Sequence, residues 1–273
     1  MSNLNEGYLF VIGDVHGCVD ELRELLALCE ERANGQPYKV GFIGDLIHKG
    51  DYPVAVMGEI IKLASSDKLA FIVKGNHEDL IQMSPKDETD RYCARVFADE
   101  SINKFLVPAV SMDTLGIKTL FIHGGLCRTS INLLDHIDKL EGVDNAREFF
   151  RNLSKKDAKK YQRINRIRRV NPDNGKYESF DATNIQPANW QEWFVDKSTA
   201  QDGIRVVYGH EPYQEVDIYA HIPSRRGKVT IGIDTGCVHG NMLTAVVFHD
   251  GGLRNFIEVK AKRKYAPSLA PLA

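Results

Sequence analysis

The sequence lacks the features that would place a protein in a membrane or outside the cell. No apolar run approaches the length of a membrane-spanning helix. The first apolar run, Tyr8–Ile12, follows acidic and polar residues, which is not the pattern of a signal peptide. The five cysteines are odd in number and form no Cys-x-x-Cys pair, which is typical of reduced thiols. We therefore expect a cytoplasmic protein that makes no contact with a membrane.

The chain also has little net charge, with a formal value of −2 over 273 residues. A nearly neutral chain is not a general binder of nucleic acid or of membrane surfaces. Its length and its hydrophobic content of 43% allow a large core, and length alone permits one domain or two. Composition therefore argues against a general nucleic-acid or membrane binder, and the function has to be inferred from the motifs.

What the sequence does contain is a repeated pattern of apolar run, glycine and metal-ligand side chain. The three early copies are Gly13-Asp14-Val15-His16-Gly17 after Tyr8–Ile12, Gly44-Asp45 after Val40–Ile43, and Gly75-Asn76-His77-Glu78 after Leu69–Val73. Each apolar run reads as a buried strand, so each ligand lies where a strand gives way to a loop. The carboxyl ends of neighbouring strands in an open α/β sheet open into one crevice. We therefore expect one shared metal site rather than three unrelated turns.

Two later histidines follow the same pattern. The apolar run Thr119–Ile122 leads into His123-Gly124-Gly125, and Ile204–Tyr208 leads into Gly209-His210. A single histidine after a strand is more often structural than a ligand. Here both follow a site already rich in Asp, His and Asn, which favours their assignment as further ligands.

In this order the motifs resemble those of the PPP-type, calcineurin-like metallophosphoesterases. That group includes serine/threonine phosphatases and symmetrical diadenosine tetraphosphatases, and the resemblance is nearest to the diadenosine tetraphosphatase branch. The strings GDxHG, GDxxxxG, GNHE, HGG and GH span residues 13–210, and Ile233-Asp234-Thr235-Gly236-Cys237 resembles a late strand end of the bacterial branch. The resemblance implies an α/β fold with four layers, in which two mixed β-sheets form a sandwich flanked by helices. Early alternation of strands and helices, followed by late hairpins, agrees with it.

The resemblance also implies two divalent metal ions that share one bridging carboxylate. The first ion would be held by Asp14, His16 and Asp45, and the second by Asp45, Asn76, His123 and His210, with Asp45 as the bridge. Carboxylate, amide and imidazole ligands suit Mn²⁺, Fe or Zn²⁺ better than metals that prefer thiolates. The resemblance favours Mn²⁺, and Co²⁺ and Ni²⁺ are further alternatives. Two such ions can activate a water and clamp a phosphoryl group for in-line displacement.

The second motif departs from the family pattern Gly-Asp-x-x-Asp-Arg-Gly, because here His48 and Lys49 stand in the Asp-Arg positions. In the protein phosphatases that Asp orients the histidine that protonates the leaving oxygen, a role that His77 would have here. Lys49 keeps the charge of the phosphate-binding Arg but loses its bidentate fork. We therefore assign His77, His48 and Lys49 to the catalytic centre and expect His77 to act without a carboxylate partner.

The ligands at positions 14 and 210 must meet, which predicts a single domain over residues 1–260. A helical insertion at about 128–203 interrupts the strand order, and residues 261–273 are expected to form a loosely held tail. Residues 151–169 contain nine basic side chains and only one acidic one, Asp157. The basic residues are Arg151, Lys155, Lys156, Lys159, Lys160, Arg163, Arg166, Arg168 and Arg169. The run is either a solvated helix face or an arm that holds an anionic substrate through Arg166, Arg168 and Arg169.

We therefore expect a hydrolase, a metal-dependent phosphoesterase whose substrate is a dinucleoside polyphosphate such as diadenosine tetraphosphate, or another polyphosphate. The alternative is a serine/threonine or broad-specificity protein phosphatase. A third interpretation, an inactive binding module, disagrees with the intact set of ligand positions. The expected partner is an anionic small molecule that contains phosphate. Nucleic acid is not expected, although an RNA 5′ end is left open, as is the oligomeric state.

Overall fold

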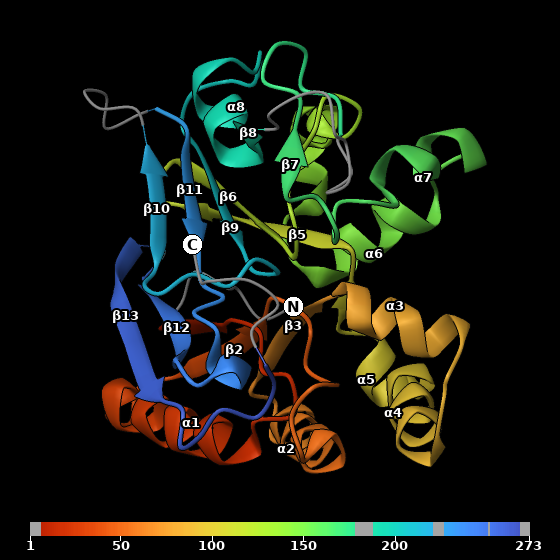
Figure 1. Cartoon of the computed structure of the whole chain (residues 1–273). Helices are drawn as coiled ribbons and strands as arrows, with labels where there is room; N and C mark the ends of the chain where they lie inside the picture. The colour runs from red at the N-terminus through yellow and green to blue at the C-terminus, as the bar shows by residue number, and fades with distance from the viewer. Residues whose placement is uncertain (1–6, 178–187, 221–226, 251, 268–273) are drawn as a thin grey trace.

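Two mixed β-sheets pack face to face in the computed structural model, which describes residues 7–177, 188–220, 227–250 and 252–267 (Figure 1). The larger sheet has the strand order β13 (Gly252–Lys260), β12 (Met242–His249), β1 (Tyr8–Ile12), β2 (Tyr38–Phe42), β3 (Leu69–Val73) and β4 (Leu106–Val107). The smaller sheet has the order β10 (Asp217–Ala220), β11 (Val229–Gly232), β9 (Ile204–Tyr208), β6 (Ile117–Ile122) and β5 (Ala109–Thr114). Strands β1 to β4 are parallel, while β12 and β13 add antiparallel pairs. The predicted sandwich of two mixed sheets is confirmed.

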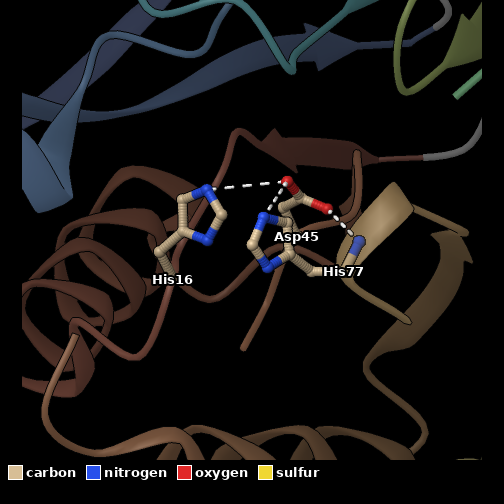
Figure 2. Close-up of side chains that lie close together, drawn as sticks. All are labelled: His16, Asp45 and His77. Carbon is tan, nitrogen blue, oxygen red and sulfur yellow. Dashed lines mark hydrogen bonds and ion pairs between the residues drawn. The ribbon is translucent and has the colours of Figure 1, made fainter. Parts of the chain in front are cut away.

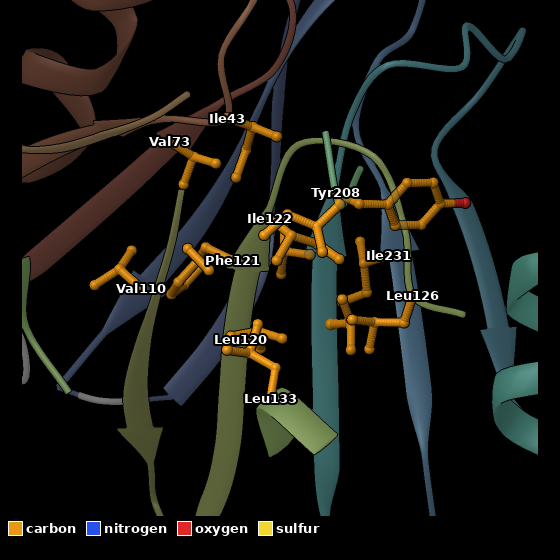
Figure 3. Close-up of a cluster of buried hydrophobic side chains, with 14 of the residues drawn as sticks. Ile43, Val73, Val110, Leu120, Phe121, Ile122, Leu126, Leu133, Tyr208 and Ile231 are labelled. Atoms are coloured by element: carbon orange, nitrogen blue, oxygen red, sulfur yellow. The ribbon is translucent and has the colours of Figure 1, made fainter. Parts of the chain in front are cut away.

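The larger sheet is buried on both faces, because successive residues of β1 face two different cores. Leu9 and Val11 belong to the core between the two sheets, whereas Phe10 and Ile12 belong to the core under the outer helices. Figure 3 shows the first core, where Ile43, directly after β2, and Val73 of β3 lie near Phe121 and Ile122 of β6. Each fully buried side chain of this size contributes about 1.5–3 kcal/mol to stability. The two sheets are therefore held firmly enough to fix the loops at their ends.

The outer helices cover the larger sheet and follow their local sequence signals. These are α1 (Val19–Ala33), α2 (Pro53–Ser65), α3 (Asn76–Met83), α4 (Glu88–Ala98) and the short α5 (Glu100–Asn103). Helix α1 buries Leu22, Leu25 and Cys29 at helical spacing, and α2 begins with proline at its first position. Helix α4 is absent from the sequence-based prediction. The Asp87 side chain caps it by accepting from the Asp90 backbone N–H.

The insertion between β6 and β9 packs on the smaller sheet and shares the core between the sheets. Its elements are the 3₁₀ helix η1 (Ile131–Leu140), α6 (Val143–Arg151), α7 (Lys155–Tyr161), the strand pair β7 (Arg169–Val170) and β8 (Ala188–Asn189), and α8 (Trp190–Asp196). Figure 1 shows α6 and α7 beside α3 at one edge of the sandwich. The insertion therefore reaches the edge where the motif loops lie.

The start of the C-terminal segment is anchored, so the expectation of a loosely held tail is wrong for residues 261–267. The buried carboxylate of Glu21 accepts from the Lys262 backbone N–H and from the Tyr265 hydroxyl, both at 2.8 Å. The Tyr265 and Ala266 backbone N–H groups donate to the carbonyl of Val238, which belongs to the short 3₁₀ helix η2 (Cys237–His239). Residues 268–273 lie outside the described part of the chain. Within the described part, no helix is both long and apolar enough to cross a membrane.

Candidate metal centre

Six polar side chains reach one point from the carboxyl ends of five strands. Strands β1, β2 and β3 are neighbours in the larger sheet, and β6 and β9 are neighbours in the smaller sheet. The loops that follow them carry the six predicted ligands, which are Asp14, His16, Asp45, Asn76, His123 and His210. The structure therefore brings together residues almost two hundred positions apart at the edge where the two sheets meet.

Asp45 lies at the middle of this cluster and faces two groups of ligands. Its Oδ2 is 3.5 Å from His16 Nε2, and its Oδ1 is 3.3 Å from His123 Nε2. Figure 2 shows the first side, with His16 and His77 directed at the Asp45 carboxylate. Asp45 belongs both to a possible metal-binding group with His16 and His77 and to one with His123 and His210. This arrangement is the one that a bridging carboxylate requires.

The remaining candidates complete the two sides. Asp14 Oδ2 is 3.9 Å from His16 Nε2, and Asn76 Oδ1 is 3.2 Å from His123 Nε2. The rings of His123 and His210 have centroids 5.0 Å apart. The His16 and His123 Nδ1 atoms each hydrogen-bond a backbone carbonyl, at 3.0 and 2.9 Å. Such second hydrogen bonds fix the ring so that Nε2 faces the centre, as metal-ligating histidines require.

Backbone strain gathers at this centre. Five non-glycine residues with positive φ angles between 46° and 72° lie here: His16, Asp45, His48, Lys49 and His210. Left-handed backbone is costly for these residue types and persists where the surrounding structure enforces it, often at functional sites. Gly75 and Gly209 leave the space that this needs, because a Cβ at either position would clash with the Asp45 or Asp14 carboxylate. The glycines of the motifs thus permit close approach of backbone to ligand.

The electrostatics of the centre show an excess of buried negative charge. Burial and then the neighbouring Asp234 raise the pKa of Asp14 well above its usual value. Burial opposes charge on His123, but the carboxylates of Asp45 and Asp14 raise its pKa to about 10. The Lys49 Nζ lies 2.8 Å from His16 Nε2, close to the same carboxylates. Bound cations would therefore stabilise this cluster of buried carboxylates.

The donor set fits divalent metal ions of the kind expected. Carboxylate oxygens, one amide oxygen and imidazole nitrogens surround the point, and no thiolate is among them. Such a set suits borderline and hard first-row ions such as Mn²⁺, Fe²⁺ or Zn²⁺. The side chains of Asp14, Asp45 and His123 are almost wholly buried, so bound ions would be shielded from bulk water.

The Nδ1 partner of His77 is the His48 imidazole and not a carboxylate, but the Asp90 carboxylate reaches His77 through His48. His48 Nδ1 lies 2.7 Å from His77 Nδ1, and His48 Nε2 lies 2.8 Å from Asp90 Oδ1. Asp90 also accepts from the Lys86 backbone N–H at 2.8 Å. The carboxylate that the second motif lacks is therefore supplied by helix α4, one imidazole further away.

This chain of hydrogen bonds fixes the protons on both rings. Asp90 can only accept, so His48 Nε2 donates to it and His48 Nδ1 becomes the acceptor for His77 Nδ1–H. The other nitrogen of His77, Nε2, then faces the centre, 3.8 Å from Asp45 Oδ2. Burial lowers the pKa of His77 to about 4. Burial alone would raise the pKa of Asp90, but the Lys86 N–H and His48 hold it below its usual value, so Asp90 stays charged.

The three arginines predicted to bind substrate lie beside the His123 and His210 loops but differ in their contacts. Arg168 donates to the His210 carbonyl oxygen at 2.8 Å, and Arg169 forms an ion pair with Glu211 at 2.7 Å. The side chain of Arg166 is exposed, and its backbone packs against Gly124. In contrast, Lys155, Lys156 and Lys159 are exposed on α7, which agrees with a solvated face for that part of the run.

Several residues that shape the centre were not predicted. Glu78 is buried and accepts from the backbone N–H groups of Asp45, Leu46 and Gly75 at 2.8–2.9 Å, which holds the second and third loops together. Burial and then Asp45 raise its pKa to about 7. Glu78 and Asp234 belong to motifs that the sequence analysis recognised, so the sequence could have marked both as residues near the centre. Asp90 carries no motif, and only the fold shows its role.

The strand ends of this sandwich place one carboxylate between two groups of nitrogen and oxygen donors, a set that fits divalent metal ions. The family model described as Calcineurin-like phosphoesterase matches residues 8–228, so the chain belongs to that family. The enzyme is thus a metallophosphoesterase that uses divalent metal ions.

Relatives and solved structures agree with this family. The chain is 24% identical, over 87% of each protein, to a symmetrical bis(5′-nucleosyl)-tetraphosphatase from Coxiella burnetii (strain CbuG_Q212). It is also 24% identical to one from Burkholderia thailandensis, over 96% of this chain and 98% of that one. A solved structure named "Crystal structure of a putative diadenosine tetraphosphatase" aligns with a TM-score of 0.56 and 19% identity, over 93% of this chain and 94% of that one. This last similarity confirms the fold.

Proposed function

We propose that this metallophosphoesterase hydrolyses phosphoric anhydride bonds of a dinucleoside polyphosphate, with diadenosine tetraphosphate as the representative substrate. The observation that carries the proposal is the position of residues 163–169, which cross the His123 loop and contact the His210 loop. Phosphates that extend beyond two metal ions need further cations, and this segment offers them. The names of the relatives agree with this substrate class.

In this proposal the six ligands hold two divalent ions, with Mn²⁺ as the favoured metal. When bound, such ions supply an activated water and a polarised phosphoryl group. The side chains of the protein supply positive charge for the substrate and a proton for the leaving oxygen. Lys49 and Arg168 supply positive charge beside the ligand loops, and His77 presents Nε2 toward the leaving oxygen. Asp90 and His48 hold His77 in the orientation that this proton transfer needs.

Metal removal should abolish the activity. Without cations the buried carboxylates of the centre repel one another, and no water is activated at neutral pH. We expect EDTA-treated protein to lose hydrolysis of diadenosine tetraphosphate and to regain it with Mn²⁺, in an assay that measures the nucleoside diphosphate product. Full hydrolysis by protein shown to be free of metal would contradict the two-ion mechanism. Parallel assays on polyphosphate and a phosphoserine peptide separate the proposed substrate from that of a protein phosphatase.

The segment of residues 163–169 gives a second prediction, which does not depend on the metal ions. Arg166→Ala removes the exposed charge beside the His123 loop, while Arg169 is already neutralised by Glu211. We expect KM for diadenosine tetraphosphate to rise about tenfold at low salt, as for one lost charge-assisted phosphate contact. The turnover of nitrophenyl phosphate, which carries one phosphate, should change little. The difference should shrink as salt rises, because the Arg166 side chain is exposed and salt weakens attraction between solvent-exposed charges.

The matched control is the triple variant Lys155→Ala, Lys156→Ala and Lys159→Ala, which removes three exposed charges from α7. If the run acts only through its overall charge, the triple variant should raise KM at least as much as Arg166→Ala. If Arg166→Ala leaves KM unchanged at low salt, the segment is a solvated surface and the polyphosphate proposal loses its main support.

A further inference from the structure

A pair of hydrogen bonds joins the insertion to the loop after β3. The side chain that forms it belongs to Asn165, which is only 6% exposed. Its amide nitrogen donates to Asp79 Oδ2 on α3 at 2.6 Å and to the Gly75 carbonyl at 3.3 Å. Both partners only accept, so they fix the orientation of the amide. Gly75 directly precedes the candidate ligand Asn76, so this pair of contacts, the Asn165 link, ends beside the metal centre.

Asp79 is itself held in the position from which it accepts. Its other carboxylate oxygen, Oδ1, lies 2.6 Å from Lys74 Nζ, and its backbone N–H donates to the Gly75 carbonyl at 3.3 Å. A hydrogen bond to a charged acceptor is stronger than one between neutral groups. The bond from Asn165 to Asp79 is therefore the stronger half of the link.

The Asn165 link lies between a second anchor and an exposed arginine. The Ile164 carbonyl accepts from the backbone N–H groups of Gly124 and Gly125, both at 2.9 Å, which fixes the preceding residue on the loop after β6. Arg166 directly follows Asn165, and its side chain is exposed. Two adjacent residues thus tie the backbone to two ligand loops immediately before this arginine.

The packing beside the link leaves a gap. A pocket of about 260 Å³ separates α3 from α6 and α7, which lie beside it in Figure 1, and Asp79 and Asn165 line this pocket. Apolar packing therefore does not hold the insertion on α3 at this point. Among the described residues, the hydrogen bonds of Asn165 make this attachment instead.

We propose that Asp79 and Asn165 are positioning residues that set the place of Arg166 relative to the metal ligands. The inference rests on the proposed function, in which Arg166 meets a phosphate beyond the metal ions. Neither Asp79 nor Asn165 touches the substrate in this role. A displacement of about 1 Å in a group that positions substrate can cost about 100-fold in rate, so a fixed backbone at this point matters.

Replacing Asn165 with Ala removes the link without changing a metal ligand. We expect KM for diadenosine tetraphosphate to rise about three- to tenfold at low salt, as for the loss of one or two hydrogen bonds, while kcat changes little. Asn171→Ala is the matched control. Asn171 is also a buried asparagine of the insertion, but its Oδ1 accepts from the backbone N–H groups of Asp173 and Asn174. This control should keep the wild-type KM.

A double variant tests whether the link acts through Arg166. If it does, Asn165→Ala adds little to the KM already raised by Arg166→Ala. Independent effects would multiply, and that result would overturn the inference. Asp79→Asn should raise KM as Asn165→Ala does, because an amide offers one oxygen to two donors, Lys74 and Asn165.

Hydrogen–deuterium exchange tests the link without any substrate. We expect the backbone amides of residues 163–168 to exchange faster in Asn165→Ala than in the wild type, and Asn171→Ala to leave them unchanged. Equal exchange in Asn165→Ala and the wild type would show that the link does not hold this segment, and the inference would be wrong. Faster exchange with an unchanged KM, where Arg166→Ala raises KM, would also overturn it and leave the proposed function standing. If the wild type does not hydrolyse diadenosine tetraphosphate, the proposed function fails and the positioning role fails with it, whereas the exchange result still reports on the link.

Discussion

Replacing Asp45 with Asn should reduce kcat/KM for diadenosine tetraphosphate by about 10³-fold or more. The two oxygens of Asp45 lie on opposite sides of the centre, 3.5 Å from His16 Nε2 and 3.3 Å from His123 Nε2. An amide replaces one of these oxygens with an NH₂ group, which cannot bind a cation. The metal ions supply several kcal/mol of transition-state stabilisation, and about 1.36 kcal/mol corresponds to a factor of ten in rate.

The same variant should also lose metal, which can be measured without any assay of activity. We expect fewer than two ions per chain by elemental analysis after dialysis against Mn²⁺, where the wild type retains two. Asp157→Asn is the control, because Asp157 is a partly exposed carboxylate paired with Lys160 on α7. An Asp45→Asn protein that keeps both ions and hydrolyses the substrate at nearly the wild-type rate would show that Asp45 does not bridge.

The metal centre was predictable because its parts are short strings tied to strand ends. Each ligand follows an apolar run directly, so the position of Asp14 or Asn76 is fixed once the strand is recognised. The observed strands β1 and β3 have the predicted bounds, Tyr8–Ile12 and Leu69–Val73. What could not be read locally is the approach of β6 and β9 to β1, β2 and β3, which depends on two sheets packing face to face. There the family resemblance provided the information.

The surroundings of the centre were less predictable, because they depend on contacts between distant segments. Asp90 meets His48 only because α4 returns along α3, and although His48 stands in the second motif, no motif marks Asp90. The residues of the basic run likewise carry the same charge in the sequence but differ in burial and in contacts. Arg168 and Arg169 are fixed beside the His210 loop, whereas the lysines of α7 are exposed. Charge counts along a sequence could not separate these positions, since burial decides which charges face the site.

Removing the imidazole of His77 should have the second large effect, and its size should depend on the leaving group. Loss of a positioned general acid costs about 10²–10⁴-fold. We expect a loss in this range for His77→Ala on an alkyl phosphate, whose leaving oxygen needs a proton. The loss should be small for nitrophenyl phosphate, which leaves readily as an anion. Equal losses on both substrates would reassign His77 to binding or to structure.

Asp90 should contribute to this step only through His48 and His77, which makes it a positioning residue. Burial lowers the pKa of His77 to about 4, so the free protein holds this ring neutral at pH 7. The Asp90 carboxylate strengthens His48 as an acceptor and so favours the doubly protonated His77 that donates from Nε2. Asp90→Asn should therefore lower kcat for the alkyl phosphate about tenfold, with little change in KM, and leave nitrophenyl phosphate nearly unaffected.

The pH profile distinguishes this role from a general weakening of the fold. A lower pKa of His77 in Asp90→Asn means that the proton is lost at lower pH, so the decline of kcat with rising pH should begin earlier than in the wild type. Asp87→Asn is the matched control, because Asp87 caps the same helix and asparagine caps equally well. Asp90→Asn keeps one oxygen that can accept from His48, while its NH₂ group replaces the oxygen that accepts from the Lys86 backbone N–H. If Asp90→Asn and Asp87→Asn have the same pH profile and the same kcat on alkyl phosphate, the chain from Asp90 to His77 holds α4 in place and takes no part in proton transfer.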